Sequence, residues 1–197
     1  MLFRSRINYR TSHQIRDRAD RLLGKAVADV DGIIERRDAT ISVFNGTTPT
    51  VQVLDSIDAE SAAVGRWMSE RTAEGVLPGE FGVFVRSEAE VERAQSALQA
   101  AGLASVVLDE SMTTARDRVT IATMHLAKGL EFRAVVVMAC DDEVLPLQAR
   151  IESVADEGDL EDTYETERHL LYVACTRARD HLLVTGVAPG SEFLGDM

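Results

Sequence analysis

Residues 118–140 read RVTIATMHLAKGLEFRAVVVMAC, and this stretch sets the fold that the rest of the chain completes. Its two ends, RVTIATM and AVVVMAC, are β-branched runs with too little polar alternation for a sheet that has one face in water. We therefore expect two central strands of a parallel sheet. Between them the basic, glycine-bearing segment TMHLAKGLEF follows directly on a strand, and ligands of such sheets bind at the carboxyl ends of the strands. This decapeptide is thus the expected position of a site.

Strands and helices alternate along the rest of the chain. The predicted strands outside this stretch are 50–55, 82–87, 104–108 and 181–186, and the predicted helices are 12–23, 61–73, 88–101 and 167–180. Thr11 with Gln14, and Ser87 with Glu90, have the spacing of capping boxes, and Gly102 stands where a helix favours a left-handed C-terminal residue. The alternation predicts an α/β fold in which helices cover both faces of a mostly parallel central sheet. Residues 25–49 show no readable pattern.

Charge is distributed unevenly along the chain. The formal net charge of −12 argues against a protein that coats nucleic acid by bulk electrostatics, because phosphate binding needs clustered Lys and Arg. The segment 152–167 is strongly acidic, and we expect it to be a solvated loop that leads into the last helix. Residues 4–37 are basic instead. An anionic partner must therefore meet a local basic surface.

Length and apolar pattern bound the class of protein. A chain of 197 residues favours one domain with one core. No apolar run approaches the roughly 18 residues that a membrane span needs, so we expect a soluble, cytoplasmic protein without membrane contact. Cys140 and Cys175 lie far apart inside apolar stretches, which is typical of buried free thiols rather than of a disulfide or a metal site. We expect no bound metal.

The nucleotide-binding patterns of α/β proteins are missing. Neither GxxxxGK[ST] nor GxGxxG occurs, so no segment of this sequence can wrap a triphosphate with backbone amides. HExxH, GxSxG and CxxC are also absent, which weakens the metal hydrolase and serine hydrolase interpretations. What remains are arginines at the edges of predicted elements, namely Arg10 in NYRT, Arg86 in FVRS and Arg177 in ACTRARD. On its own the chain should not be an ATPase.

Four segments carry a resemblance to a known family. NYRTSHQI at 8–15, VFVRS at 83–87, TMHLAKGLEFRAVVV at 123–137 and ERHLLYVACTRARDHLLV at 167–184 resemble four consecutive motifs of the UvrD/Rep-like superfamily 1 DNA helicases, in the family's order. The resemblance implies that residues 1–197 form a single domain, the C-terminal, second RecA-like motor domain, a three-layer sandwich. The implied domain lacks both the P-loop domain and the large accessory insertion of the family.

The resemblance assigns nucleotide roles to five residues. Arg10 and Arg177 resemble the two arginines that reach the γ-phosphate, where a permanently charged guanidinium can stabilise phosphoryl transfer. Tyr9 resembles the aromatic residue that stacks on adenine, and Glu131 the acid that accepts a hydrogen bond from the ribose. Gly129 would let the backbone approach the phosphates. ATP with Mg²⁺ is expected only when the chain is joined to the N-terminal P-loop domain of the same full-length protein, with no cofactor bound tightly to this chain alone.

The same resemblance assigns a grip on single-stranded DNA. Thr123 and His125 resemble residues that hold the strand backbone, and Arg86 resembles a further DNA contact. Two departures stand out: Thr11 occupies a position where serine is usual, and Leu126 replaces a commoner small or polar residue. The implied function is the C-terminal motor domain of an ATP-dependent helicase. The alternatives are a non-catalytic RecA-like regulatory or protein-interaction module and a sequence-neutral module that binds single strands.

Overall fold

The computed structural model describes residues 7–8, 10–23, 26–28, 34–36, 41–42, 44–109, 115–154 and 156–197. Tyr9, the expected adenine-stacking residue, lies outside these described residues. The strands are β1 (Ile7–Asn8), β2 (Ala26–Ala28), β3 (Ile34–Arg36), β4 (Ile41–Ser42), β5 (Thr50–Leu54), β6 (Phe81–Val85), β7 (Ser105–Val107), β8 (Val119–Thr123), β9 (Phe132–Val137) and β10 (Ala178–Val187). The helices are α1 (His13–Asp20), α2 (Ile57–Ala73), α3 (Val91–Ala100), α4 (Gln148–Glu152) and α5 (Glu157–Cys175), with 3-10 turns η2 (Pro78–Glu80), η3 (Glu88–Glu90), η4 (Met124–Ala127) and η5 (Glu192–Asp196).

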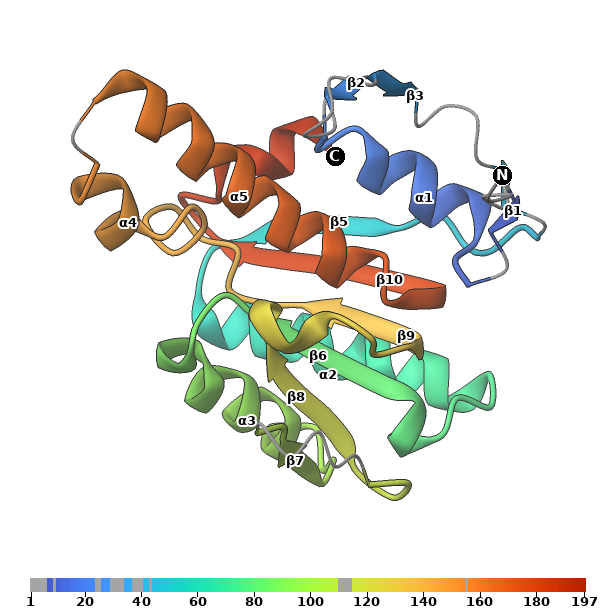
Figure 1. Ribbon diagram of the computed structural model, residues 1–197. Coiled ribbons are helices and arrows are strands. Elements are labelled where there is room, and N and C mark those ends of the chain that lie inside the picture. The colour runs from blue at the N-terminus through green and yellow to red at the C-terminus, as the bar shows by residue number, and fades with distance from the viewer. Residues whose placement is uncertain are drawn as a thin grey trace.

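A six-stranded sheet forms the centre of the molecule (Figure 1). Its order is β5-β10-β9-β6-β8-β7, and every neighbouring pair is parallel. The two apolar runs of residues 118–140 are the interior strands β8 and β9, so the prediction of central parallel strands is confirmed. Two small two-stranded sheets, β1 with β4 and β2 with β3, stand apart from it.

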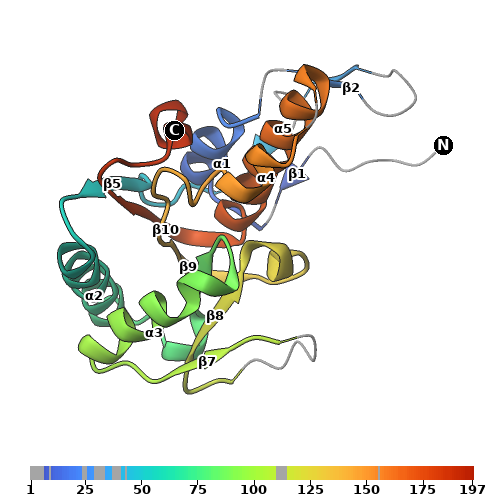
Figure 2. The same ribbon diagram turned by 90° about the vertical axis from the view of Figure 1, so that its left-hand side faces the viewer.

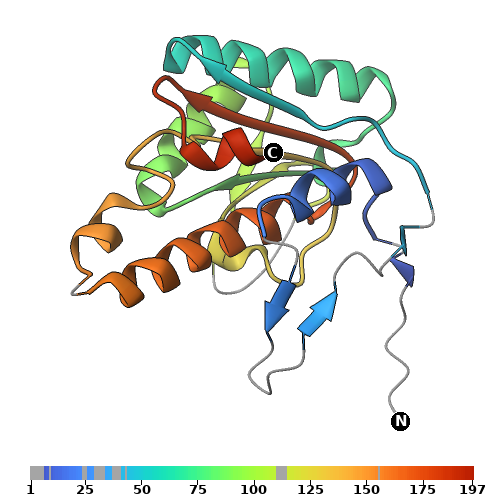
Figure 3. The same ribbon diagram turned by 90° about the horizontal axis from the view of Figure 1, so that it is seen from above.

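Helices cover both faces of the central sheet, as Figures 2 and 3 show from two directions. Side chains of a strand alternate between the faces, which divides the core into two clusters. On one face Phe84, Val135 and Val184 pack with apolar residues of α1 and α5. On the other face the neighbouring Val83 and Val136 pack with apolar residues of α2 and α3. The predicted α/β three-layer sandwich is therefore confirmed.

One connection determines where the functional residues lie. Strand β6 stands between β8 and β9, so the chain must pass over β6 to travel from the carboxyl end of β8 to the amino end of β9. Residues 124–131 do this without a full helix, and Met124 and Ala127 of η4 pack in the same cluster as Leu171 and Ala174 of α5. This crossing segment therefore connects the carboxyl ends of the strands with their amino ends, on the face of the sheet that α5 covers.

Two local predictions about helix ends are wrong. The N-cap of α1 is Ser12, and neither Thr11 nor Gln14 forms a capping box, because their side chains bind Thr176 and Gly46 from distant segments. Ser87 makes no side-chain cap either, since η3 intervenes before α3 begins at Val91. Gly102, by contrast, has the expected left-handed conformation, with φ of 71°.

The acidic segment is also different from the prediction. Helix α5 already begins at Glu157, so most of residues 152–167 is helical rather than a loop. The side chain of Asp156 accepts a hydrogen bond from the backbone N–H of Asp159 at 3.0 Å, which caps the first turn. Acidic residues in that turn are favourable next to the positive end of the helix dipole.

Candidate functional site

Three of the predicted nucleotide residues converge on one pocket. The Arg10 Nε atom lies 2.7 Å from Glu131 Oε1, although both side chains are mostly exposed. Arg177 lines the same cavity. The cavity has a volume of about 150 Å³ and is lined by Arg10, Thr11, Arg16, Glu131, Tyr172, Thr176 and Arg177. Its three guanidinium groups, of which that of Arg16 is paired with Asp20, suit the phosphate end of an anionic ligand.

Arg177 is held by its own helix and by the crossing segment. It follows the C-terminus of α5, and its Nε donates to the carbonyl oxygen of Val173 at 3.0 Å. Nη1 donates to Leu130 O at 3.5 Å and Nη2 to Thr176 Oγ1 at 3.3 Å. Burial lowers the pKa of Arg177, Glu131 opposes this shift, and the like charge of Arg10 adds to it. A guanidinium keeps its charge at neutral pH regardless, so Arg177 is a fixed cation aimed by three acceptors.

Gly129 has a backbone reason to be glycine. Its φ is 88°, in the left-handed region that residues with a Cβ rarely adopt, and a Cβ there would meet nothing within 4 Å. The structure thus explains this glycine by the turn that brings Glu131 to the pocket. Close approach to phosphates at Gly129 stays a prediction.

The predicted residues divide between the two ends of the parallel strands, the amino ends and the carboxyl ends. Glu131 directly precedes β9 and Arg177 directly precedes β10, so the pocket lies at the amino ends of these strands. Thr123 ends β8, and His125 follows it at the carboxyl end. The expectation of one site at the carboxyl ends is therefore wrong for the nucleotide residues. The decapeptide contains the whole crossing segment, so it reaches from the carboxyl ends of the strands to their amino ends.

At the carboxyl edge His125 is exposed and Thr123 is half-buried. Burial, followed by the charge of Arg86, lowers the pKa of His125, with Glu167 opposing and Arg150 adding to the shift. The lowered pKa favours the neutral imidazole of His125, which offers a hydrogen bond rather than a charge. This character suits contact with a sugar-phosphate backbone by hydrogen bonding.

Arg86 does not have the expected surface role. Its side chain is 2% exposed, and its Nε and Nη2 atoms each lie 2.6 Å from an oxygen of Glu167, which is fully buried. Because the guanidinium is buried and two of its nitrogens bind Glu167, the structure gives Arg86 a structural role in place of the expected surface contact with DNA. Burial raises the pKa of Glu167, but the hydrogen bonds and charge of Arg86, the Leu147 N–H and the charge of Arg150 together outweigh this and lower the pKa.

Sequence reasoning missed the other partners of Glu167. Arg150 Nη1 lies 3.0 Å from Glu167 Oε1, and the backbone N–H of Leu147 donates to Oε2 at 3.3 Å. Glu167 thus joins α5 to the end of β6 and to the turn before α4. No local signal could identify this residue, because it sits in an acidic run and its partner Arg86 is 81 positions away.

A second buried carboxylate fixes the path of the chain after β9. Glu60 of α2 is fully buried, accepts from the backbone N–H of Ala139 at 3.1 Å and from Thr185 Oγ1 at 2.7 Å, and pairs with Arg93. Arg93 also binds Asp141, whose Oδ1 accepts from the backbone N–H of Val187. Ala139 has a φ of 57°, so this network holds a strained turn in place. We assign it to the fold.

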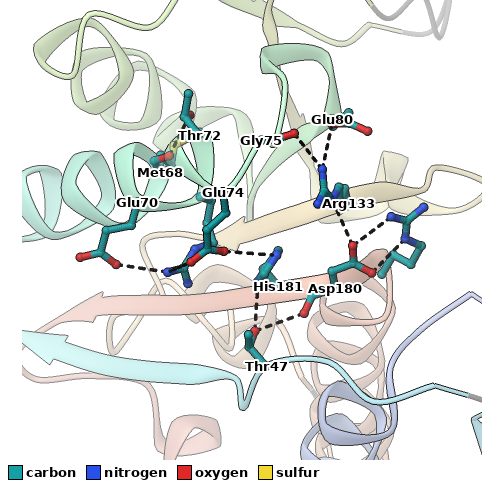
Figure 4. Close-up of polar contacts among 12 residues, drawn as sticks. Thr47, Met68, Glu70, Thr72, Glu74, Gly75, Glu80, Arg133, Asp180 and His181 are labelled. Atoms are coloured by element: carbon teal, nitrogen blue, oxygen red, sulfur yellow. Dashed lines mark hydrogen bonds and ion pairs between the residues drawn. The ribbon is translucent and has the colours of Figure 1, made fainter.

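His181 belongs to a polar cluster at the amino ends of β9 and β10 (Figure 4). It is 8% exposed, with Nδ1 3.1 Å from Thr47 Oγ1 and Nε2 3.8 Å from Glu74 Oε2. Nearby, Arg133 binds Asp180 Oδ2 at 3.1 Å and the carbonyl oxygen of Gly75 at 2.8 Å. The cluster connects the end of α2 to the sheet, so His181 has a structural role.

The state of His181 predicts a pH dependence of stability. Burial and then the charge of Arg71 lower its pKa below the ordinary value of 6.5, with Glu74 opposing in part. Between the folded and unfolded pKa values the unfolded chain binds more protons, so the free energy of unfolding falls as pH drops below 6.5. In urea unfolding of the isolated chain at pH 7.5, 6.5 and 5.5, His181→Gln should reduce this slope. An unchanged slope would show that His181 does not titrate differently in the two states.

Among the residues that the structure describes, no group of three or more His, Cys, Asp or Glu side chains is arranged to hold a metal ion. Within the same part of the chain, no helix combines the length and apolar character needed to cross a membrane.

Comparison with known proteins gives a consistent result. Residues 86–188 match the family model of the UvrD-like helicase C-terminal domain. ATP-dependent DNA helicase PcrA of Staphylococcus aureus (strain MRSA252) is 40% identical over 81 residues, which cover 41% of this chain and 10% of that protein. PcrA of Staphylococcus epidermidis (strain ATCC 12228) is 40% identical over 89 residues, covering 45% and 12%. The chain thus matches about a tenth of the length of these relatives.

A solved structure extends the likeness to nearly the whole chain. The crystal structure of the C-terminal domain of a possible DNA helicase from Lactobacillus plantarum WCFS1 superposes with a TM-score of 0.65. Sequence identity is 25%, and the match covers 96% of this chain and 93% of the other. It therefore includes the α1 region that carries Arg10, which the family model does not reach.

Proposed function

Because this chain belongs to the family of UvrD-like helicase C-terminal domains, we propose that it is the second motor domain of an ATP-dependent DNA helicase. The observation that carries the proposal is the convergence of Arg10, Glu131 and Arg177 on one pocket. These residues come from three segments that are distant in sequence. The proposal includes a cytoplasmic location and a partner, the N-terminal P-loop domain of the full-length protein. We further propose that this motor domain functions without a large accessory insertion between β7 and β8.

In this function the pocket faces ATP that is held by the P-loop domain. Arg10 and Arg177 would act as arginine fingers on the γ-phosphate, where such groups are worth about 10³ to 10⁵ in rate. Mg²⁺ bound with ATP would neutralise phosphate charge, and its protein ligands would come from the partner domain. Tyr9 remains our candidate for the adenine stack.

The pair between Arg10 and Glu131 supports an exchange when the nucleotide arrives. Glu131 would transfer from Arg10 to a ribose hydroxyl, and Arg10 would exchange this ion pair for a contact with a phosphate. Both side chains are more than half exposed. A surface ion pair of this kind contributes only about 0 to 1 kcal/mol, so a nucleotide can break it at little cost.

DNA would bind at the opposite edge, against Thr123 and His125. Two rigid elements join this edge to the nucleotide pocket. The crossing segment begins directly after Thr123 and carries His125 near one end and Glu131 at the other. Helix α5 carries Glu167, which binds Arg86 at the carboxyl end of β6, and Arg177 follows the C-terminus of the same helix. Closure of the ATP cleft would therefore move the strand-gripping residues relative to the partner domain.

The DNA part of the proposal is tested at His125. In this chain joined to its P-loop domain, His125→Ala should raise the single-strand concentration that gives half-maximal ATP hydrolysis by about fivefold. This factor corresponds to one neutral hydrogen bond of about 1 kcal/mol. The matched control is His169→Ala, an exposed histidine of α5, which should leave that concentration unchanged. Equal concentrations for the parent and His125→Ala would remove His125 from the DNA contact.

A further inference from the structure

We propose that Thr11 is a positioning residue that keeps the two arginine fingers, Arg10 and Arg177, in register with each other. The inference rests on the proposed function, because it concerns the aim of the groups that would act on ATP. It assigns a role to a buried hydroxyl that belongs to neither finger. Substituting it should change the rate of hydrolysis without removing any charged group from the pocket.

The hydroxyl of Thr11 makes a long-range bond next to both fingers. Its side chain is 2% exposed, and Oγ1 donates to the carbonyl oxygen of Thr176 at 3.0 Å across 165 positions of sequence. The next peptide continues the contact, since the backbone N–H of Ser12 donates to Arg179 O at 3.0 Å. The chain just after Arg10 is therefore fastened to the segment that contains Arg177.

The partner of Thr11 is also the residue that orients Arg177. The Thr176 hydroxyl donates to Val173 O at 3.0 Å and accepts from Arg177 Nη2 at 3.3 Å. Thr11 therefore anchors the backbone of the residue whose side chain holds the second finger. A shift at this contact would change the separation between Arg10 and Arg177.

The hydrogen bond from Thr11 opposes an electrostatic repulsion between the two arginines. Arg10 and Arg177 are like charges at one pocket, and Arg10 contributes to lowering the Arg177 pKa. Repulsion between them favours their separation. Glu131 attracts both, but the proposed exchange with ribose would take its carboxylate away from Arg10. The bond from Thr11 to the Thr176 carbonyl is uncharged and does not involve Glu131, so the proposed exchange does not remove either of its partners.

A purely structural role for Thr11 is the competing interpretation. The Thr176 carbonyl lies at the C-terminus of α5, where carbonyl groups have no partner within the helix. Thr11 would then only satisfy this acceptor and stabilise the fold. The two interpretations differ in what a conservative substitution changes, which is the maximal rate in one case and only the melting temperature in the other.

The test uses this chain joined to its P-loop domain, with saturating single-stranded DNA. Thr11→Val keeps the shape and removes the hydroxyl, while Thr11→Ser keeps the hydroxyl. We expect Thr11→Val to lower kcat by about 10- to 100-fold with the KM for ATP within about threefold, because a misplacement of about 1 Å can cost 10²-fold. Thr11→Ser should stay within about twofold of the parent. The Tm of Thr11→Val should fall by no more than about 5 °C.

Thr47→Val is the matched control, because Thr47 Oγ1 also donates to a backbone carbonyl, that of Asp180, but away from the pocket. It should keep the parental kcat. Should Thr11→Val fail to fold, Thr11→Ala provides the same comparison with less bulk. A parental kcat in a folded variant without the hydroxyl, or a Thr11→Ser variant as slow as Thr11→Val, overturns the inference. Arg177→Ala is measured in parallel, and if it keeps the parental rate, the proposed function fails instead.

Discussion

Replacing Arg177 with alanine should lower the DNA-stimulated rate of ATP hydrolysis by about 10³-fold or more in this chain joined to its P-loop domain. The guanidinium is held in place by three acceptors, on Val173, Leu130 and Thr176. Alanine removes the positive charge together with the hydrogen bonds that orient it. The loss should appear in kcat, with a small change in the KM for ATP, since a finger acts mainly on the charge that develops during phosphoryl transfer.

Two further variants sharpen this prediction. Arg179 lies two residues further along the chain, is half exposed and binds its neighbour Asp180, so Arg179→Ala should stay within about twofold of the parental rate. Arg177→Lys keeps a charge but loses the planar, forked set of donors, and we expect it to remain at least about 10²-fold below the parent. Parental hydrolysis by Arg177→Ala would show that Arg177 is not a finger.

The largest effect on stability is expected at Glu167. Glu167→Ala should reduce the free energy of unfolding by about 3 to 5 kcal/mol, because it leaves the Arg86 guanidinium buried without its counter-charge. Leu147 N–H would lose its acceptor as well, and Arg150 its partner. Urea unfolding of the isolated chain measures this as a lower midpoint at an unchanged slope.

The double variant Arg86→Met with Glu167→Leu distinguishes the cost of lost packing volume from the cost of leaving Arg86 buried without its counter-charge. Replacing a buried ion pair by apolar residues of similar volume is often close to neutral, so the double variant should recover a large part of the loss. As a control, Arg21→Ala breaks an exposed pair with Asp17 and should cost less than about 1 kcal/mol. A cost below about 1 kcal/mol for Glu167→Ala would contradict the structural role and return Arg86 to the DNA contacts.

Much of the fold follows from local sequence pattern. The β-branched runs at 118–124 and 134–140 require a sheet covered on both faces, and that requirement predicts the layers. Strand order is different, because nothing in either run indicates that β6 inserts between β8 and β9. The resemblance therefore assigned nucleotide residues and DNA residues to the same decapeptide, but nothing in the sequence indicated that this segment crosses the sheet from the carboxyl ends of the strands to their amino ends.

The misses at Thr11, Gln14 and Arg86 share one physical cause, which is competition from partners distant in sequence. Thr11 and Gln14 have the spacing of a capping box, yet Thr176 and Gly46 offer their side chains tertiary hydrogen bonds. Arg86 sits at a strand end where arginine is normally solvated, and only the fully buried Glu167 makes its burial tolerable. Such pairings depend on the completed fold, so no local rule could have predicted them.

The measurement closest to the central claim compares ATP hydrolysis by the P-loop domain alone with hydrolysis by the same domain joined to this chain, both with saturating single-stranded DNA. We predict a rise of about 10³-fold or more on joining, because the arginines of this chain complete the site. An equal rate in the two proteins would contradict the account, since the pocket formed by Arg10, Glu131 and Arg177 would then contribute nothing to ATP hydrolysis.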